Sequence, residues 1–600
     1  MININSSDTK KYKDGLPMNT INNIRNILNN LGIFIVEAGW QNSAEGFYSV
    51  NLMIANTNLT TNGKGTTYEY ALASGYGELM ERLQNQSFFR LNADLKPEAL
   101  KYKGFYYAPD EKYLSIKDIE NSDEDWIKIQ LSRIKQKSDV YELLKKWKLV
   151  SYEDISADFV ALPYVNLNND TKSYIPIKMI SKMYMSNGMC AGNTMQEALV
   201  QGLSEVFERY VNKKILNDKI TPPTIPRSYI EKYPRLDSMI KQIESSGNFQ
   251  VIVKDCSLNE GYPVVGVVFI NRDDQTYFNK FGSHPIFEIA LERTLTELLQ
   301  GQNVKNIIGV KEFSFKNHID DASKNLIGIL VNGSGFYPTE FFEQKFSYEF
   351  KEFKDVTNYD NKQMFVYLMD MLEKKEFNVF VRNVSYLGFP SYHIIVPGLS
   401  EIDEIDDIKS ISDYIQYNKI KKHIRNIDNL SHNEIEDIIS YFQNANYNNG
   451  ASITKFLNLP VKNIFPWYYT NVDLFLCALH YKKHDFPKAY ESFVRFLNNI
   501  QPNLYSNIMI VYYKCVRDYI GTRIDNWDQK YAVNFLSTFY PANIINDVVT
   551  DFGNAEQIFN SYGQIKCWNC EECKLRNSCL DDSTEKVYKT LKDRYDLIKK

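Results

Sequence analysis

Pairs of glutamates three residues apart recur in this sequence at matched positions. The segments Gly65–Arg82 and Gly192–Arg209 align without a gap: Ala follows Gly by six residues, and both segments end in Glu-x-x-Glu-Arg. Residues three apart share one face of a helix, so each pair of carboxylates should project together. One such motif is ordinarily a solvated face with an ion pair, but its recurrence at fixed spacing favours a functional site. The pairs are Glu78 with Glu81 and Glu205 with Glu208.

A third segment is a partial copy of the same pattern. Ala290 precedes Glu297 by seven residues, the spacing found between Ala and the first Glu in the other two segments. Gln300 stands where the second Glu would be. Three matched helices predict a symmetric or layered arrangement of the elements that carry them.

The chemistry that suits these side chains is that of a magnesium–nucleotide site. Carboxylates that converge in a partly buried site repel one another unless a cation neutralises them. Mg²⁺ prefers oxygen ligands and is usually held by a few carboxylates together with substrate phosphates. Guanidinium groups bind phosphate oxygens. Each segment supplies one beside its glutamates, namely Arg82, Arg209 and Arg293.

Glycine-containing segments precede the first two helices, at 62–65 and 187–194. We interpret them as loops that could bind anions at helix N-termini, the alternative being simple helix caps. The sequence contains no Gly-x-x-x-x-Gly-Lys-Ser/Thr motif, so any use of ATP would lie outside the P-loop architecture.

Length and composition predict a multidomain globular protein. The chain has 600 residues, 44% hydrophobic and 14% aromatic, and a formal net charge of -5. That charge argues against a general nucleic-acid surface. The apolar stretch near Pro263–Ile270 is far too short to span a membrane, and no secretory signal is evident. We therefore expect a cytoplasmic protein that contacts neither nucleic acid directly nor membrane.

Two regions are expected along the chain. Residues 1–400 mix strand and helix patterns and predict an α/β (α+β) domain. An acidic stretch after Pro397-Gly398 marks the boundary, and residues 401–600 are predicted to be helical. Within them, 471–498 predicts two helices joined near 484–485, which resemble one tetratricopeptide hairpin or an isolated hairpin in a bundle. Expected strands are 251–254, 262–271, 365–372 and 393–396; expected helices are 18–31, 69–83 and 195–214.

Four cysteines lie within residues 567–579, spaced C-x2-C-x2-C-x5-C. Such a cluster predicts a metal site, because both zinc and an iron–sulfur cluster accept four thiolates. Structural zinc sites more often use two separated C-x2-C pairs, so the spacing favours iron–sulfur. The cluster comprises Cys567, Cys570, Cys573 and Cys579, whereas Cys190, Cys256, Cys477 and Cys515 are scattered and expected in the core.

Several of these segments resemble the YcaO family. The resemblance is carried by 186–194 and 200–211, supported by 281–285, 290–301 and 394–398, and extends from about Lys13 to Pro397. The similarity is greatest to the member found in enteric bacteria, and it includes the helical region 467–498. It implies a domain that binds ATP and Mg²⁺ and phosphorylates an amide oxygen.

The resemblance also implies roles for individual residues. Glu78, Glu81, Glu205, Glu208 and Glu297 would be magnesium ligands or their close neighbours, and Glu297 would also take part in catalysis. Arg209 and Arg293 would contact phosphates and act in catalysis. Asn187 and Asn193 would lie in the nucleotide pocket. Lys13 matches an N-terminal lysine near the nucleotide.

Members of the family differ in the nucleophile that attacks the activated amide. Azoline-forming members end in Pro-x-Pro-x-Pro, whereas this sequence ends at 595–600 without proline, which disfavours azolines. The enteric member is linked to β-methylthiolation of the twelfth small-subunit ribosomal protein. We therefore expect a protein or peptide substrate, a radical methylthiotransferase partner and a homodimer. The alternatives are thioamide or azoline formation in peptide natural products, and a non-catalytic ATP-binding scaffold.

Overall fold

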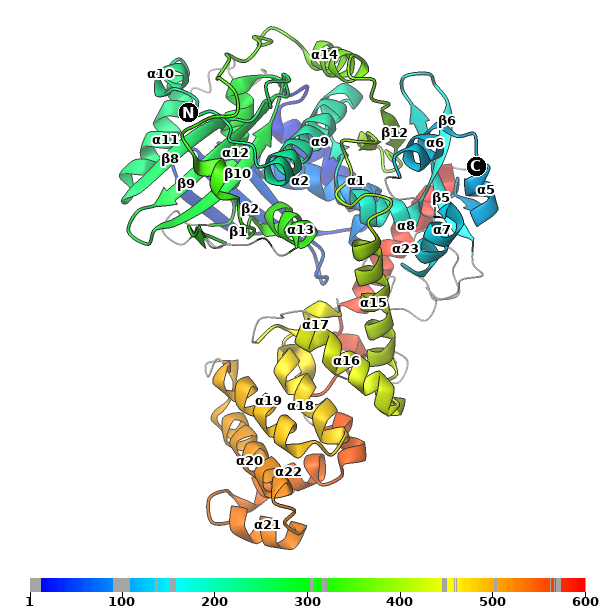
Figure 1. Cartoon of the computed structure of the whole chain (residues 1–600), viewed down its shortest axis with the longest axis vertical. Coiled ribbons are helices and arrows are strands. Elements are labelled where there is room, and N and C mark those ends of the chain that lie inside the picture. Colours follow the sequence, from blue (N-terminus) through cyan, green and yellow to red (C-terminus); the bar gives the residue numbers. More distant parts are fainter. Residues whose placement is uncertain are drawn as a thin grey trace.

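The computed structural model shows an α/β body from which a helical arm extends (Figure 1). It describes residues 12–89, 108–134, 139–150, 158–302, 307, 309–315, 319, 321–444, 450–457, 459, 461–500, 504–561, 563–565, 567 and 573–598. None of the helices among these residues combines the length and hydrophobicity that a membrane crossing requires.

Three antiparallel sheets form the body. The first has the order β1 (Ile35–Ala44), β2 (Phe47–Ile54), β3 (Thr60–Gly65). The second has the order β11 (Lys311–Glu312), β10 (Thr276–Ser283), β9 (Val264–Asn271), β8 (Phe249–Asp255). The third has the order β4 (Lys112–Leu114), β5 (Phe159–Asn166), β12 (Phe380–Asn383), β13 (Ser391–Ile395), β7 (Met189–Ala191), and β6 (Lys172–Pro176) pairs with β5.

Helices cover these sheets, and three of them carry the repeated glutamates. Those three are α2 (Tyr68–Gln84), α9 (Met195–Asp218) and α12 (Phe287–Leu298). The other helices of the body are α1 (Pro17–Asn30), α5 (Ile116–Glu120), α6 (Asp125–Ser132), α7 (Val140–Leu149), α8 (Ile177–Met179), η1 (Ile180–Tyr184), α10 (Arg227–Ile230), α11 (Pro234–Ser245), α13 (Ala322–Asn332), η2 (Thr339–Phe342) and α14 (Asn361–Glu373).

The repeat is a strand–helix unit that extends beyond the glutamates. The N-cap of each helix lies four residues before its alanine, at Thr67, Thr194 and Ile286. The hydroxyl groups of Thr67 and Thr194 accept a hydrogen bond from the backbone of the first helical turn, as threonine caps do. The side chain of Ile286 has no acceptor atom and forms no such bond. The third copy therefore has the same start without the same cap.

Small residues let each strand cross close over its helix. In each copy, the strand residue eight positions before the repeat alanine packs against the helix residue four positions after that alanine. These pairs are Gly63 with Gly75, Cys190 with Gly202, and Gly282 with Thr294. A Cβ on Gly75 would lie 3.3 Å from Gly63 N, and a Cβ on Gly202 would lie 2.8 Å from Cys190 Sγ. In the third copy the glycine is on the strand, where a Cβ on Gly282 would lie 2.2 Å from the Thr294 hydroxyl oxygen. All three copies thus share the same crossing.

The glycines at 62–65 are strand residues, so the prediction of a loop there was wrong, whereas anion binding at these residues stays a prediction. Gly63 and Gly65 lie in β3, and Cβ atoms on them would fall 2.0 Å from Ala71 O and 2.5 Å from Ala71 N. Gly192 similarly lies against Ala198, whose N would be 2.8 Å from its Cβ. Close packing of strand on helix therefore accounts for these glycines.

The three units are arranged cyclically. Helix α2 contacts its own strand β3 and also β7, α9 contacts β7 and also β10, and α12 contacts β10 and also β3. Each helix thus lies between the strand of its own copy and the strand of the next copy. This pseudo-threefold arrangement is the symmetric layout that the repeat predicts.

Residues beyond 400 are mainly helical. The helices are α15 (Ile408–Arg425), η3 (Ile427–Asn429), α16 (His432–Asn444), α17 (Ile453–Phe456), η4 (Pro466–Tyr469), α18 (Val472–Lys482), α19 (Phe486–Asn498), α20 (Asn507–Ile524), α21 (Gln529–Leu536), α22 (Ala542–Phe552), η6 (Ala555–Asn560), η7 (Arg576–Ser578) and α23 (Asp581–Ile598). The hairpin predicted over 471–498 is present as α18 and α19. The arm has its own core, to which Phe475, Phe493 and Val516 belong.

The last helix, α23, returns to the body. Val587 and Leu591 pack into the core that contains residues of α1 and α2. Tyr595 stacks on Tyr386 with ring centroids 4.2 Å apart, and its hydroxyl accepts a hydrogen bond from Arg382 Nη2 at 2.9 Å. Helix α23 is therefore part of the folded body.

The segment 365–372, expected as a strand, is helical in α14. Asp360 and Gln363 form a capping box at its start. Met364, Leu368 and Leu372 are four residues apart and fully buried, which is the spacing of a helix face. The β-branched and aromatic residues of 365–367 suggested a strand, but tertiary burial of this stripe prevails.

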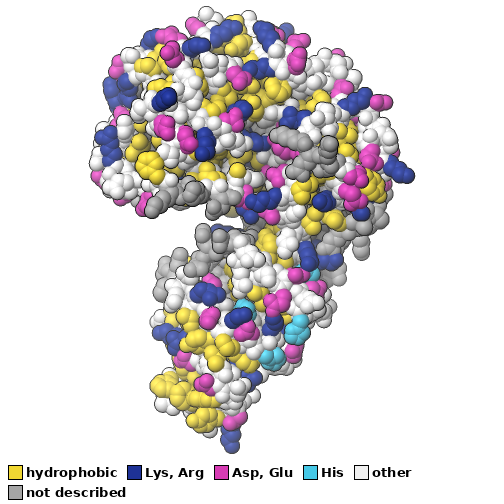
Figure 2. Space-filling model, in the orientation of Figure 1, with side chains coloured by type: hydrophobic (Ala, Val, Ile, Leu, Met, Phe, Trp, Pro, Cys, Tyr) yellow, Lys and Arg dark blue, Asp and Glu magenta, His cyan; other side chains and the backbone are white. Residues whose placement is uncertain are grey.

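The surface matches the modest net charge of the sequence. On the face shown in Figure 2, acidic and basic side chains are interspersed over the body, without a large region of one sign. Hydrophobic side chains gather at the tip of the arm, where Tyr531, Phe535 and Phe539 are exposed.

Candidate functional site

The glutamates of α2 and α9 lie close enough for their charges to influence one another. Burial raises the pKa of Glu78, and the negative charge of Glu205 raises it further. Burial also raises the pKa of Glu81 well above its usual value, and Glu205 and Glu78 add to this effect. The two pairs that the repeat predicted are thus brought together from helices more than 100 residues apart in the sequence.

Two arginines neutralise carboxylates of their own helix. Arg209 Nη2 lies 3.0 Å from Glu205 Oε1, and Arg82 Nη2 lies 3.4 Å from Glu78 Oε1. Both pairs have the i,i+4 spacing that brings side chains together on a helix. The arginines of the first two copies are therefore held beside the glutamates as predicted.

Glu297 of α12 joins the site through lysines. Lys64 of β3 forms an ion pair with Glu297, and Lys280 Nζ of β10 lies 3.9 Å from Glu297 Oε1. Burial and the nearby charge of Arg293 lower the pKa of Lys64 to about 7. Sequence reasoning missed both lysines, although Lys64 lies between the two glycines that open the first repeat.

The charge of Arg293 influences several of the site residues, including Lys64 and Glu208. Its Nη1 donates a hydrogen bond to Gln201 Oε1 at 2.7 Å. Burial and the charge of Glu205 raise the pKa of Glu208, and Arg293 counteracts this. Arg293 is also near enough to His284 to help lower the pKa of that imidazole.

A second group of polar residues lies at the start of α9. Lys13 Nζ lies 3.2 Å from Glu197 Oε1, and Asn193 Nδ2 donates to Glu197 Oε2 at 3.0 Å. Thr20 Oγ1 donates to Asn193 Oδ1 at 2.6 Å. Burial alone would raise the pKa of Glu197, but Lys13 and the hydrogen bonds to the carboxylate hold it below its usual value.

This group unites Lys13 and Asn193, two residues predicted for the nucleotide pocket. Glu197 and Thr20 complete it and were missed. The available signal for Glu197 was a glutamate directly before the repeat alanine, where the other copies have Tyr70 and Ile289.

His284 and Tyr12 both lie near enough to Arg293 to be influenced by its charge, and His284 is also influenced by Lys13 of this group. The rings of Tyr12 and His284 are 5.7 Å apart between centroids, edge to face. His284 Nδ1 accepts a hydrogen bond from Ile286 N at 3.1 Å, at the start of α12 where no threonine cap is present. Burial lowers the pKa of His284 well below its usual value, and the charges of Arg293 and Lys13 add to this. The imidazole is therefore neutral at pH 7.

Asn187 is placed differently from the other predicted residues. It is fully buried, and its side chain donates from Nδ2 to Ser400 O at 2.7 Å. The side-chain amide of Asn187 thus binds the backbone at residue 400, where the α/β region ends, and not the glutamates of α2 and α9.

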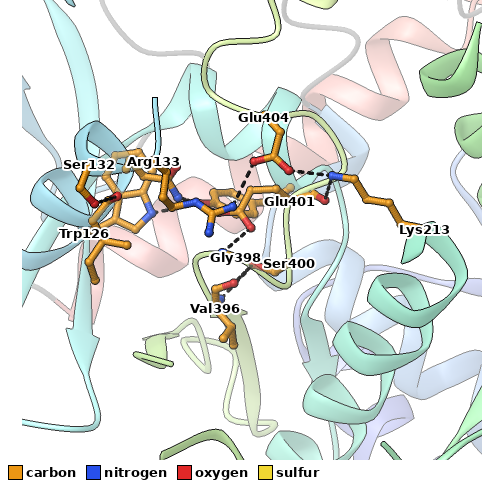
Figure 3. A network of polar contacts seen from close by, with 12 residues as sticks. Trp126, Ser132, Arg133, Lys213, Val396, Gly398, Ser400, Glu401 and Glu404 are labelled. Carbon is orange, nitrogen blue, oxygen red and sulfur yellow. Dashed lines mark hydrogen bonds and ion pairs between the residues drawn. The ribbon is translucent and has the colours of Figure 1, made fainter. Parts of the chain in front are cut away.

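A polar network holds the segment 398–404, at the end of the α/β region, against α9 and the end of α6 (Figure 3). Lys213 Nζ of α9 lies 3.0 Å from Glu404 Oε1, and Arg133 Nη2 lies 3.2 Å from Glu404 Oε2. The Glu401 carboxylate accepts a hydrogen bond from Gly398 N at 2.8 Å. The network fixes the segment after β13 to the helix that carries Glu205.

Three of the clustered cysteines are within the described residues. Cys567, Cys573 and Cys579 are partly exposed, whereas Cys570 lies outside the described residues. In the described part of the chain no group of three or more His, Cys, Asp or Glu side chains is arranged to hold a metal ion. The four scattered cysteines are buried, as predicted: Cys190, Cys256, Cys477 and Cys515.

The sequence profile of YcaO cyclodehydratases, described as ATP- and Mg²⁺-binding, matches residues 62–400. The chain belongs to the YcaO family. It is 36% identical over 403 residues to an uncharacterized Haemophilus influenzae protein, covering 65% of this chain and 66% of that relative. It is 35% identical over 396 residues to the Escherichia coli K12 ribosomal protein S12 methylthiotransferase accessory factor YcaO, with coverage of 65% and 66%. Each match thus spans just under two thirds of the relative.

Solved structures match this chain at low sequence identity and low TM-score. A heterocyclase in complex with substrate and cofactor has a TM-score of 0.42 and 16% identity, covering 65% of this chain and 53% of the other. The YcaO of Methanopyrus kandleri bound with AMPPCP and Mg²⁺ has a TM-score of 0.38 and 16% identity, covering 64% and 92%.

Proposed function

We propose that this YcaO protein uses ATP and Mg²⁺ to activate an amide of a protein or peptide by phosphorylating its carbonyl oxygen. The observation that carries the proposal is the convergence of glutamates from three repeated helices with Arg293 and Lys64 among them. Such a mixture of anionic and cationic side chains suits a metal ion and phosphate oxygens in one place.

The chemistry of the side chains fits this pair of ligands. Glu78, Glu81 and Glu208 have raised pKa values, so their ionised forms lack compensation that a bound cation would supply. Glu205 and Glu297 offer further carboxylate oxygens. Bound ATP and Mg²⁺ would supply the phosphoryl group and the neutralisation of its charge.

The residues of the chain would then act by positioning and by electrostatics. Arg209 and Arg293 would hold phosphate oxygens, where fixed positive charge is effective. Lys13 and Asn193, joined through Glu197, would hold another part of the nucleotide. An amide is a poor electrophile, and a phosphorylated oxygen becomes a leaving group once a nucleophile has added to the carbon.

The E. coli relative supports a role beside a methylthiotransferase. We propose that this chain is an accessory factor in β-methylthiolation of a small-subunit ribosomal protein, with a radical methylthiotransferase as partner, acting in the cytoplasm as a homodimer. In this proposal residues 1–400 form the ATP-binding domain, and residues 401–600 form a tetratricopeptide-like domain that offers the partner surface. Helix α23 would join the two, since it packs on the body.

We further propose that Cys567, Cys570, Cys573 and Cys579 bind an iron–sulfur cluster or zinc. The support is their spacing, since four thiolates within 13 residues suit either metal site. Elemental analysis of protein purified with and without oxygen separates the two: iron with labile sulfide indicates the cluster, and stoichiometric zinc indicates the structural ion. Absence of both would contradict the proposal.

Binding of Mg·ATP by defined variants tests the main proposal. Titration calorimetry should show that Glu205→Ala and Arg293→Ala weaken binding by about 100-fold or more, because each removes a charge that faces the ligand. Glu45→Ala is the matched control, since Glu45 is exposed on the turn between β1 and β2, and it should bind like the parent. Parental affinity in the first two variants would overturn the site.

The reaction itself is tested by product analysis. Mass spectrometry of ribosomal proteins after gene deletion should show loss of the β-methylthio mark. The family description as cyclodehydratases favours a second candidate, in which a peptide natural product gains an azoline or thioamide. A modified short peptide, with the ribosomal mark intact, would support that candidate. Binding of ATP without phosphate release with any such substrate would indicate a scaffold.

A further inference from the structure

We infer that Gln201 is a positioning residue that aims the Arg293 guanidinium into the site without cancelling its charge. The inference rests on the proposed function, since it concerns how the phosphate-binding arginine is held. It assigns a role to a residue outside the glutamate–arginine pattern.

The contact joins two of the glutamate-bearing helices. Arg293 Nη1 of α12 donates to Gln201 Oε1 of α9 at 2.7 Å. Gln201 precedes Glu205 by four residues on α9, so both side chains project from the same face of the helix. The amide therefore holds Arg293 on the side of α9 that carries the carboxylates.

The partners of Arg293 differ from those of the other two arginines. Arg82 and Arg209 form ion pairs with the glutamates four residues before them. Within the part of the chain that the structure describes, Arg293 forms no ion pair. A guanidinium that meets a neutral acceptor keeps its full charge for a phosphate, whereas the charge of one paired with a carboxylate is partly offset until that carboxylate binds a cation.

The acidic residues closest to Arg293 in sequence are engaged elsewhere. Glu292 Oε2 lies 3.2 Å from Arg235 Nη1 of α11. Glu297, four residues after Arg293 on the same helix, forms its ion pair with Lys64. Glu292 and Glu297 are thus paired with other cations, and Gln201 is the hydrogen-bond partner of Arg293.

The repeat explains why these two residues meet. Gln201 and Arg293 each follow the repeat alanine by three residues, in the second and third copies, and Ser74 has this position in the first. Since α9 contacts both β7 and β10, the second and third units lie against each other. Equivalent positions of neighbouring copies thus face one another, and the bond between them depends on the pseudo-threefold arrangement.

Two variants separate positioning from a purely structural tie between α9 and α12. Gln201→Met keeps the length of the side chain and removes the acceptor. Gln201→Glu keeps an acceptor but adds a negative charge, which would strengthen a structural tie and neutralise Arg293. Gln416→Ala, an exposed glutamine on α15, is the control.

Mg·ATP affinity by calorimetry and melting temperature are measured for each variant. We expect Gln201→Met to weaken binding about ten-fold, the size expected for loss of a hydrogen bond to a charged group. Gln201→Glu should weaken it at least as much while its melting temperature does not fall. Gln416→Ala should match the parent. Gln201→Met added to Arg293→Ala should cause no further loss, because the two residues act as one unit.

The outcomes distinguish this inference from the proposed function. If Arg293→Ala abolishes binding but both Gln201 variants bind within two-fold of the parent, the positioning role is wrong and the site stands. A fall in melting temperature in Gln201→Met, with parental affinity in both Gln201 variants, would show a structural tie instead. If Arg293→Ala itself binds like the parent, the proposed function fails.

Discussion

Lys64 on β3 forms an ion pair with Glu297 on α12, which joins the first and third copies of the repeat at the site. The strand of one copy thus supplies the cation, and the helix of another supplies the carboxylate. Glu297 is one of the carboxylates proposed to bind magnesium. Because Lys64 is paired with this carboxylate, it competes with the metal for Glu297.

Replacing Lys64 with methionine should therefore tighten metal binding. Without the competing ammonium group, Glu297 is free to bind a cation, and we expect Mg²⁺ without nucleotide to bind about three-fold tighter or more. Titration with Mn²⁺ followed by electron paramagnetic resonance measures this directly. Lys280→Met is the matched control, because Lys280 is 3.9 Å from Glu297 and should change the affinity less. Weaker metal binding in Lys64→Met would show that Lys64 assists the metal instead.

The raised pKa values of the glutamates predict a pH dependence of the metal-free protein. The pKa of Glu81 is higher in the folded state than its usual value of 4.5, so folding favours its protonated form. The associated stability is present at low pH and is lost as pH rises through the folded pKa. We expect the melting temperature to fall as pH rises above 4.5.

Glu81→Gln checks the cause of that decline. Glutamine cannot ionise, so the variant should lose less stability over the same range and melt about 1–3 °C higher at pH 6.5. Saturating Mg·ATP should flatten the curve of the parent protein, because bound metal favours the ionised glutamates. Identical curves for parent and variant would mean that Glu81 does not cause the decline.

The sequence predicted the positions of the glutamate-bearing helices well because their signals are local. Thr67 and Thr194 cap α2 and α9, and the glutamate spacing follows the helical period. The misread glycines of β3 show the limit of such signals, since a glycine beside a helix start can serve either a ligand or close packing. The close packing becomes evident only from the crossing of strand and helix.

The contacts that complete the site could not be predicted from local pattern. Lys13 meets Glu197, and Arg293 meets Gln201, only because units distant in the sequence pack against each other. The return of α23 to the body is similar, because an amphipathic helix does not specify which core it will cover. The four-cysteine pattern, in contrast, is local, and its proposed metal remains a prediction.

The docking of α23 predicts unequal effects of two leucines on that helix. Leu591 is 2% exposed in the core shared with α1 and α2, whereas Leu597 is 59% exposed. Leu591→Ala should lower the free energy of unfolding by about 2–4 kcal/mol, because it leaves a cavity. Leu597→Ala should change it by less than about 0.5 kcal/mol. Urea unfolding of both variants tests this, and equal effects would show that α23 is not docked in solution.

The network around Glu404 carries the last prediction. Burial alone would raise the pKa of Glu404, but Lys213 and Arg133 lower it below its usual value of 4.5. A carboxylate with a depressed folded pKa contributes stability above its usual pKa, and that stability is lost as pH falls through the folded value. Glu404→Gln should therefore destabilise the protein at pH 7, by roughly 1 kcal/mol for a partly exposed pair.

The difference between parent and Glu404→Gln should shrink as pH falls below 4.5, because the parent carboxyl then also becomes neutral. Thermal unfolding across pH 3.5–7 measures it. Glu352→Gln is the control, since Glu352 pairs with Lys232 on the surface, where both side chains are more than half exposed, and it should cost much less. A destabilisation by Glu404→Gln that stayed constant with pH would mean that its charge does not hold the segment after β13 to α9, and that shape alone does.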